Sequence, residues 1–269
     1  MTDAHCHVSC GDPSVRELLV GRDFFGVHPW ETLGSGGRSE TSGRSETSGR
    51  VATQVPLLPQ VPPLHTLASL RARLTANPKA GVGEIGLDRL KCRDIPPLMR
   101  EVFEAQLALA FELRRPVVLH GAKCWGQVVR TCEKALEERH LRRPAAGSRL
   151  SGDAASELPL RFLFHGFSRS DGLIPDIVRL GGFISVGPAV LNDHAVNYRE
   201  LVKKIPMDRL LVETDRTEGT CETGETGASY SRPLIYDVLA KTAELRGTSA
   251  AELERITDVN VDAFMRNMV

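Results

Sequence analysis

Short runs of β-branched and aromatic residues alternate along this chain with stretches of helical periodicity, and this alternation limits the folds open to it. A strand, a helix and a further strand in succession form a unit whose two strands lie parallel, joined by a right-handed crossover. Repetition of that unit predicts an α/β protein with a parallel sheet. The candidate strands are Thr2–Val8, Phe24–Val27, Ala80–Glu84, Pro116–His120, Arg161–His165, Gly182–Val186 and Arg209–Glu213.

The clearest helix is predicted at Pro97–Arg115. Its apolar residues recur at steps of three or four, which is typical of one stripe of an amphipathic helix. Proline near the start and Arg-Arg-Pro at the end indicate the boundaries of that helix. At 269 residues, the first candidate is a TIM-barrel-like (β/α) barrel, and an open doubly wound sheet is the second.

Residues 37–50 interrupt the alternation with GRSETSGRSETSGR, a six-residue repeat that contains no apolar residue. Such a segment has nothing to bury, so we expect a disordered insertion. The strand and helix pattern resumes after it. We therefore expect residues 1–269 to form a single domain.

Composition excludes several classes of protein. Lys plus Arg and Asp plus Glu are both 34, so the net charge is zero, which argues against coating nucleic acid through bulk charge. No run approaches the ~20 apolar residues of a membrane helix, and the first residues lack a secretory signal. The six cysteines form no CxxC pair, so we expect free thiols and a cytoplasmic location. The sequence leaves the oligomeric state open, and a monomer is favoured.

Histidines and carboxylates gather at the predicted strand ends. In β/α folds these ends share one face, so distant segments converge there. His5 and His7 are two residues apart on a strand and point the same way. Side by side, two neutral imidazoles favour a bound cation. Cys6 and Cys10 flank His7, which leaves a thiolate site open, although small buried thiols are the preferred interpretation. The strand-end set is His5, His7, His28, Glu84, His120, His165 and Asp215.

Six motifs together resemble the TatD-like metal-dependent hydrolases, most closely a compact branch of that family. They are DAHCH, GVHPW, VGEIGLD, PVVLHGAKCW, FLFHGFS and LLVETD, and they occur in the family's order over most of the chain. The resemblance implies a TIM-barrel-like fold of the amidohydrolase superfamily with a divalent metal centre. Many members are magnesium- or manganese-dependent deoxyribonucleases that remove nucleotides from DNA ends.

The resemblance also implies a role for each matching residue. His5 and His7 would hold one metal ion, Glu84 would bridge two, and His120 and His165 would hold the second. Asp215 would contact a metal ion and accept the proton of the attacking water. Mixed histidine and carboxylate ligands suit Zn or Mn, and the resemblance adds Mg, so the identity of the two divalent ions stays open among these three.

Other residues near these motifs have two interpretations each. Three of them are candidate contacts for a substrate phosphate: His28, Lys123 and Arg169. The alternative is that His28 only packs in the mouth of the barrel and that the two cations are only solvated. Trp125 could stack a base, but a core position is preferred. Asp88 is expected to support a ligand or form a turn rather than to bind metal.

The chain departs from the family between Gly11 and Arg22, where members usually carry a further strand and helix. That interval is too short for both. We therefore expect seven regular strands, with the eighth missing or replaced by irregular chain.

The predicted activity is metal-dependent hydrolysis of phosphodiester bonds, with DNA as the substrate of an exonuclease. The same chemistry could cleave an amide or a lactone instead. A non-catalytic binding protein on the same fold is a further alternative, although all six ligand positions are chemically intact. GxSxG and GxxxxGK[ST] are absent, so serine hydrolysis and a P-loop have no support.

Overall fold

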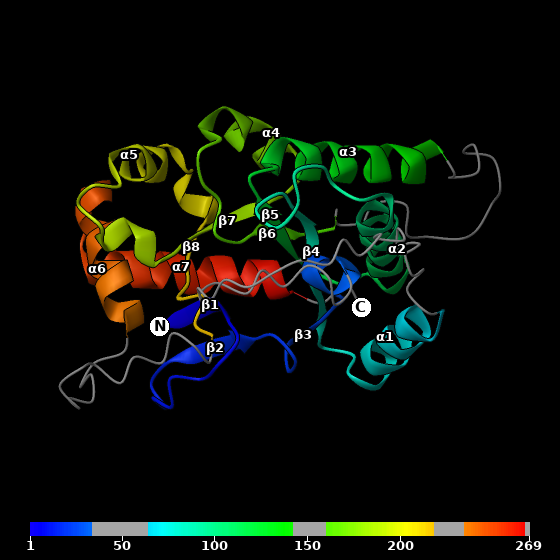
Figure 1. The fold of residues 1–269 in the computed structure, drawn as a ribbon. Coiled ribbons are helices and arrows are strands. Elements are labelled where there is room, and N and C mark those ends of the chain that lie inside the picture. The colour runs from blue at the N-terminus through cyan, green and yellow to red at the C-terminus, as the bar shows by residue number, and fades with distance from the viewer. Residues whose placement is uncertain (34–63, 142–159, 218–233, 267–269) are drawn as a thin grey trace, which may run out of the picture.

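A computed structural model describes residues 1–33, 64–141, 160–217 and 234–266. Its main sheet has six parallel strands in the order β3-β4-β5-β6-β7-β8, and helices cover its outer face (Figure 1). The strands are β1 Thr2–Cys6, β2 Arg16–Leu19, β3 Phe24–Phe25, β4 Gly81–Asp88, β5 Val117–Ala122, β6 Phe162–Phe164, β7 Phe183–Val186 and β8 Leu210–Val212. The predicted parallel α/β organisation is confirmed.

The helices between and after these strands also follow the predicted alternation. The helix expected at Pro97–Arg115 is α2, and it ends two residues early because Arg114 adopts the left-handed conformation at φ 53°. The α-helices are α1 Leu64–Ala76, α2 Pro97–Leu113, α3 Trp125–Leu141, α4 Ile174–Arg179, α5 Val196–Lys204, α6 Leu234–Arg246 and α7 Ala250–Met265.

The expectation of seven regular strands is wrong, because the described residues contain eight. The additional strand is β2. This short strand lies inside the Gly11–Arg22 interval and pairs with β1 in parallel. No helix separates β1 from β2 in this part of the chain. Four residues suffice for a strand because β1 already supplies the pairing edge, whereas a crossover helix would need a longer connection.

Backbone contacts link the β1–β2 pair to both edges of the main sheet. The Asp215 N–H donates to the His5 carbonyl at 3.0 Å, beyond the end of β8. Val20 forms an isolated parallel bridge with Phe24 at the start of β3. These contacts place the β1–β2 pair beside both edge strands of the main sheet, as in a TIM-barrel-like fold, while the two sets of strands remain separate sheets.

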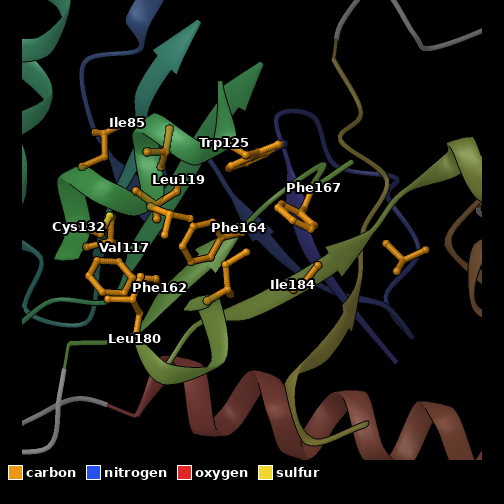
Figure 2. Close-up of a cluster of buried hydrophobic side chains, with 14 of the residues drawn as sticks. Ile85, Val117, Leu119, Trp125, Cys132, Phe162, Phe164, Phe167, Leu180 and Ile184 are labelled. Atoms are coloured by element: carbon orange, nitrogen blue, oxygen red, sulfur yellow. The ribbon is translucent and has the colours of Figure 1, made fainter. Parts of the chain in front are cut away.

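The outer face of the sheet is continuously apolar. Alternate residues of the central strands point toward the helices, and their side chains form the larger core cluster (Figure 2). Val117, Leu119, Phe162, Phe164 and Ile184 belong to it. Because side chains alternate between the two faces of a strand, the intervening residues point to the interior of the barrel.

The interior is apolar at the end where the strands begin. We call this the floor cluster. In Figure 1 the long helix α7 runs beside β1 and β8, and its Val261 and Phe264 enter this cluster. The helix is held there by the Asn260 side-chain amide, which donates to the carbonyls of Met207 and Leu210 at 2.8 and 2.9 Å. The cluster consists of Ala4, Leu18, Phe24, Val118, Leu163, Phe183, Leu211, Val261 and Phe264.

The structure can be compared with some of the predictions only in part. The repeat at 37–50 lies outside the described residues, so its disorder and the single-domain organisation stay predictions. Cys6, Cys10, Cys92, Cys124 and Cys132 are free thiols, and Cys221 lies outside the described residues. Within the described ranges, the helices are all too short or too polar to span a bilayer.

Candidate metal centre

All six side chains predicted to bind metal meet at the carboxyl end of the barrel, which we call the mouth. They lie within or just after β1, β4, β5, β6 and β8, separated by as many as 210 positions in the sequence. Parallel strands bring these positions to one face because every strand runs in the same direction. The set is His5, His7, Glu84, His120, His165 and Asp215.

Glu84 lies at the centre of this group, and its side chain is 3 % exposed. Its Oε2 atom faces β1, where the Nε2 atoms of His5 and His7 lie 3.5 and 3.3 Å away. Asp215 Oδ1 completes this side, at 3.6 Å from His5 Nε2 and 3.5 Å from His7 Nε2. Two imidazoles and two carboxylate oxygens therefore surround one small space.

The other oxygen of Glu84 faces a second group of histidines. Oε1 lies 2.6 Å from His120 Nδ1 and 2.5 Å from His165 Nε2. His28 Nε2 lies 3.5 Å from the same oxygen. One buried carboxylate thus separates two histidine groups, each of which contacts a different oxygen atom.

The histidine nitrogens on the β1 side have few other partners. His5 is fully buried, and neither of its ring nitrogens has a hydrogen-bond partner among the described residues. An unpaired buried polar group is unfavourable unless a ligand uses it. A divalent cation fits this position because it would accept the Nε2 lone pair while contacting the Glu84 and Asp215 carboxylates.

Charge balance in the group supports the same fit. Burial lowers the pKa of His165, but the adjacent Glu84 carboxylate outweighs it and raises that pKa to about 10. Hydrogen bonding to Asp215, and then to Glu84, raises the pKa of His7 to about 9. Protons on these imidazoles balance the carboxylates, and a divalent cation would replace those protons on binding.

Asp88 supports His120 and has no free oxygen toward the centre. Its Oδ2 lies 2.9 Å from His120 Nε2 and accepts a hydrogen bond from the Trp30 Nε1–H at 2.5 Å. Its Oδ1 accepts from the backbone of Leu90 and Lys91. A proton on His120 Nε2 leaves the lone pair on Nδ1, which faces Glu84 and His165. This geometry agrees with the predicted supporting role of Asp88.

His28 carries its proton on the same nitrogen, Nε2, but in this residue Nε2 is the atom that faces Glu84. Its Nδ1 accepts a hydrogen bond from the Trp30 backbone N–H at 3.1 Å. A neutral imidazole that accepts at one nitrogen carries its proton on the other. The Nε2 atom near Glu84 is therefore an N–H donor, suited to a substrate oxygen rather than to a metal ion.

Glu213 is a buried carboxyl that the sequence interpretation did not select. It follows β8, where it accepts hydrogen bonds from the Gly166 N–H at 2.7 Å and the Ser185 hydroxyl at 2.5 Å. Its Oε1 lies 4.0 Å from His165 Nδ1. Burial raises the pKa of Glu213 to about 7. The sequence did contain a signal for it. Side chains two residues apart on a strand point the same way, so Glu213 points into the barrel as Leu211 does.

Asp3 and Asp215 connect the first strand to the last. The Asp3 carboxylate accepts from the Thr214 N–H at 3.0 Å and from its hydroxyl at 2.6 Å. Asp215 follows in the left-handed conformation, at φ 49°, and its side chain is 45 % exposed. Burial acts to raise the pKa of Asp215, but His7, His165 and His5 outweigh it, and the pKa is lowered.

The remaining predicted contacts lie at the rim. Lys123 is exposed after β5, whereas Trp125 is 5 % exposed and packs against Phe164 and Phe167, as preferred from the sequence. Arg169 is exposed and lines a groove of about 1020 Å³ that starts at Glu213 and Asp215. The groove passes between the loops that follow β6 and β7 toward α5.

A TIM-barrel-like α/β fold with a buried carboxylate among histidines at its mouth defines a metal-dependent hydrolase. Comparison with known sequences gives the family. Residues 22–266 match the family described as TatD related DNase, and the chain belongs to that family. The resemblance inferred from the motifs is confirmed.

Curated relatives of this chain include hydrolases and nucleases. It is 27 % identical to the uncharacterised metal-dependent hydrolase YabD of Bacillus subtilis, over 72 % of this chain and 68 % of that protein. It is 29 % identical to the 3′-5′ ssDNA/RNA exonuclease TatD of Klebsiella pneumoniae, over 67 % of this chain and 62 % of the relative. The chain therefore spans about two thirds of the length of these relatives.

Solved structures give the same fold. The TatD homologue YjjV of Escherichia coli aligns with a TM-score of 0.56 at 25 % identity, over 74 % of this chain and 70 % of that one. A TatD family hydrolase of Entamoeba histolytica aligns with a TM-score of 0.60 at 14 % identity, over 93 % and 75 %. The second comparison supports the fold alone.

Proposed function

We propose that this hydrolase is an exonuclease that uses two divalent metal ions to cleave phosphodiester bonds in DNA. The observation that carries the proposal is the position of Glu84, with one oxygen toward His5 and His7 and the other toward His120 and His165. A carboxylate placed in this way can hold two cations close together despite their mutual repulsion. The relatives named as ssDNA/RNA exonucleases support the choice of substrate.

Each ion would have its own ligands. His5 Nε2, His7 Nε2, Glu84 Oε2 and Asp215 Oδ1 would hold the first. Glu84 Oε1, His120 Nδ1 and His165 Nε2 would hold the second. Imidazole ligands favour Mn or Zn, and carboxylate ligands also suit Mg, so the proposal covers these three metals.

Bound divalent ions would supply Lewis-acid activation of water and of the phosphate. The protein's own residues supply the proton transfers and the orientation. Asp215 has a lowered pKa and a partly exposed carboxylate, so it is ionised at neutral pH and can accept a proton from attacking water. His28 would donate a hydrogen bond from its Nε2–H to a phosphate oxygen.

The substrate would enter beside Asp215. The groove that begins there carries Arg169 at its edge, and a guanidinium pairs well with phosphate oxygens. Lys123 stands at the rim on the β5 side. Because only a few cations take part, we expect a shallow dependence of binding on salt concentration.

The test combines metal analysis with a comparison of substrates. The purified protein is assayed for bound metal and then given single-stranded oligonucleotides, amides and lactones with Mg, Mn or Zn. We expect stepwise shortening of the oligonucleotide and a loss of about a thousandfold in Asp215→Asn. Asp262→Asn, on the exposed surface of α7, is the matched control. Cleavage of amides or lactones alone would contradict the proposal.

Two features of the whole protein stay predictions. A monomer is checked by its mass in solution, and a cytoplasmic location by fractionation of the source cells. Neither affects the assignment of the metal centre.

A further inference from the structure

We propose that the exposed face of Trp30 is a stacking platform for a base of single-stranded nucleic acid, next to the metal centre. This inference rests on the proposed nuclease function and adds a recognition site for the base. Every base has an aromatic face, so such a platform binds without a strong sequence preference.

Trp30 combines exposure with a fixed position. It lies in the short 3-10 helix Pro29–Leu33 after β3, and 47 % of its surface is exposed. Its Nε1–H donates to Asp88 Oδ2 at 2.5 Å. The edge of the indole is therefore anchored while part of the ring stays open to solvent. Such a ring loses little conformational freedom when a base stacks on it, which favours binding.

The ring is also adjacent to the reacting groups. The ring centroids of Trp30 and His28 are 4.7 Å apart, and His28 Nε2 lies 3.5 Å from Glu84 Oε1. The centroids of Trp30 and His120 are 6.1 Å apart. A base on Trp30 would thus belong to a nucleotide whose phosphate lies close to the metal centre.

A cation accompanies the ring. Lys91 Nζ lies over the ring, 4.9 Å from its centroid, and because the Lys91 side chain is exposed it can move aside when a base stacks there. An ammonium at this position attracts the phosphate attached to a stacked base, and its long stem allows it to move toward that phosphate. Aromatic and basic groups side by side are typical of surfaces that bind single strands.

The second tryptophan shows what a structural ring looks like in this protein. Trp125 is 5 % exposed, and its ring packs 5.8 Å from Phe164 and 5.3 Å from Phe167. It has no face left for a ligand. Since the chain has two tryptophans, changes in fluorescence on ligand binding at the mouth would report mainly on Trp30.

The experiment uses two phosphorothioate probes that resist cleavage, in the presence of Mg²⁺. One is an oligothymidylate, and the other is an abasic strand with the same number of phosphates. We expect the oligothymidylate to quench tryptophan fluorescence and to bind about tenfold more tightly than the abasic strand.

Variants separate stacking from other effects of the side chain. Trp30→Leu and Trp30→Phe both lack the indole N–H that Asp88 accepts, but only Phe keeps an aromatic face. We expect Trp30→Leu to lose about tenfold in affinity for oligothymidylate and Trp30→Phe to lose about threefold. Leu90→Ser, an exposed neighbour at 58 %, is the control and should bind as the wild type does.

The outcomes distinguish the two proposals. If the wild type binds both probes equally and Trp30→Leu changes nothing, the stacking platform is overturned and the nuclease function stands. Equal losses in Trp30→Leu and Trp30→Phe would also overturn the platform, because the missing N–H would then explain both. If the wild type binds neither probe, both proposals fail.

Discussion

The two halves of the barrel interior differ in chemistry, although the same strands build both. Residues that point inward near the floor are apolar. Two positions further along each of four strands, where the side chain points inward again, the residue is polar or ionisable. The floor residues are Val118, Leu163, Phe183 and Leu211, and their counterparts at the mouth are His120, His165, Ser185 and Glu213.

This difference separates stability from function within one fold. The floor cluster gains free energy from buried apolar surface and needs no partner beyond the chain. The mouth buries carboxylates and imidazoles, whose desolvation is unfavourable until a ligand offsets it. Substitutions in the two halves should therefore have separable effects on unfolding and on ligand binding or turnover.

The largest expected effect tests the floor. Phe264 is fully buried, with the rings of Phe24 and Phe183 at 6.0 and 5.9 Å. Phe264→Ala should lower the free energy of unfolding by about 3 to 5 kcal/mol, because it removes apolar contact and leaves a cavity. Urea denaturation measures this loss. Phe264→Leu should lose less, and activity per folded molecule should stay near the wild-type value. A loss in Phe264→Ala below about 1 kcal/mol would contradict the floor's role.

The second prediction tests the mouth through the pH dependence of the protein's stability. Burial raises the pKa of Glu213 to about 7 from 4.5, so the folded protein retains a proton that the unfolded chain releases. Its contribution to stability is present below pH 4.5 and is lost as the pH rises through 7. Between pH 5 and pH 8, the free energy of unfolding of the metal-free wild type should fall by roughly 2 kcal/mol more than that of Glu213→Gln.

Denaturation in chelator at the two pH values measures that difference. Glu252→Gln on α7, whose carboxylate pairs with Arg255 on the surface, should keep the wild-type decrease. If the decrease is the same in Glu213→Gln and the wild type, Glu213 does not hold the extra proton.

The third prediction tests whether Asp88 positions the candidate metal ligand His120. Asp88→Asn leaves His120 Nε2 without its carboxylate partner, so the tautomer and the ring orientation are less well fixed. Affinity for Mn or Zn should fall about tenfold to a hundredfold, as measured by competition with a metal indicator. Asp176→Asn on α4, a half-buried residue whose carboxylate pairs with Arg179 of the same helix, is the control. Affinity within twofold of the wild type would show that Asp88 does not position His120.

The smallest effect lies at the rim. Arg169→Ala should raise KM for an oligonucleotide about threefold and reduce the salt dependence of binding by about one phosphate contact, with kcat little changed. Arg255→Ala, on α7, serves as the comparison. A larger change in kcat than in KM would place Arg169 in the chemical step instead.

The sequence predicted the elements whose signals are local. Buried parallel strands read as apolar runs, and the ionisable residue that ends each run falls at the mouth, as His120 and His165 do. The i, i+2 spacing of His5 and His7 placed both on one side of β1. These inferences succeeded because strand direction and side-chain alternation fix where such residues go.

Other features depend on contacts between distant segments. β2 is four residues long and is stabilised by pairing with β1, so its own sequence gives a weak signal. The exposed ring of Trp30 is oriented by Asp88, 58 positions away. Glu213 was missed because the neighbouring Asp215 dominated the motif, although alternation from Leu211 pointed to it.

The bond between Asp3 and Thr214 spans 211 positions of the chain, and this has a consequence for synthesis. While the protein emerges from the ribosome, the first strand has no edge from the last strand to dock against, and His5 in that strand and His7 after it lack Asp215. With the proposed ligand set, metal binding would therefore come late in biogenesis, after nearly the whole barrel has been made. Until then, β1 and its thiol at Cys6 depend on other surfaces for protection.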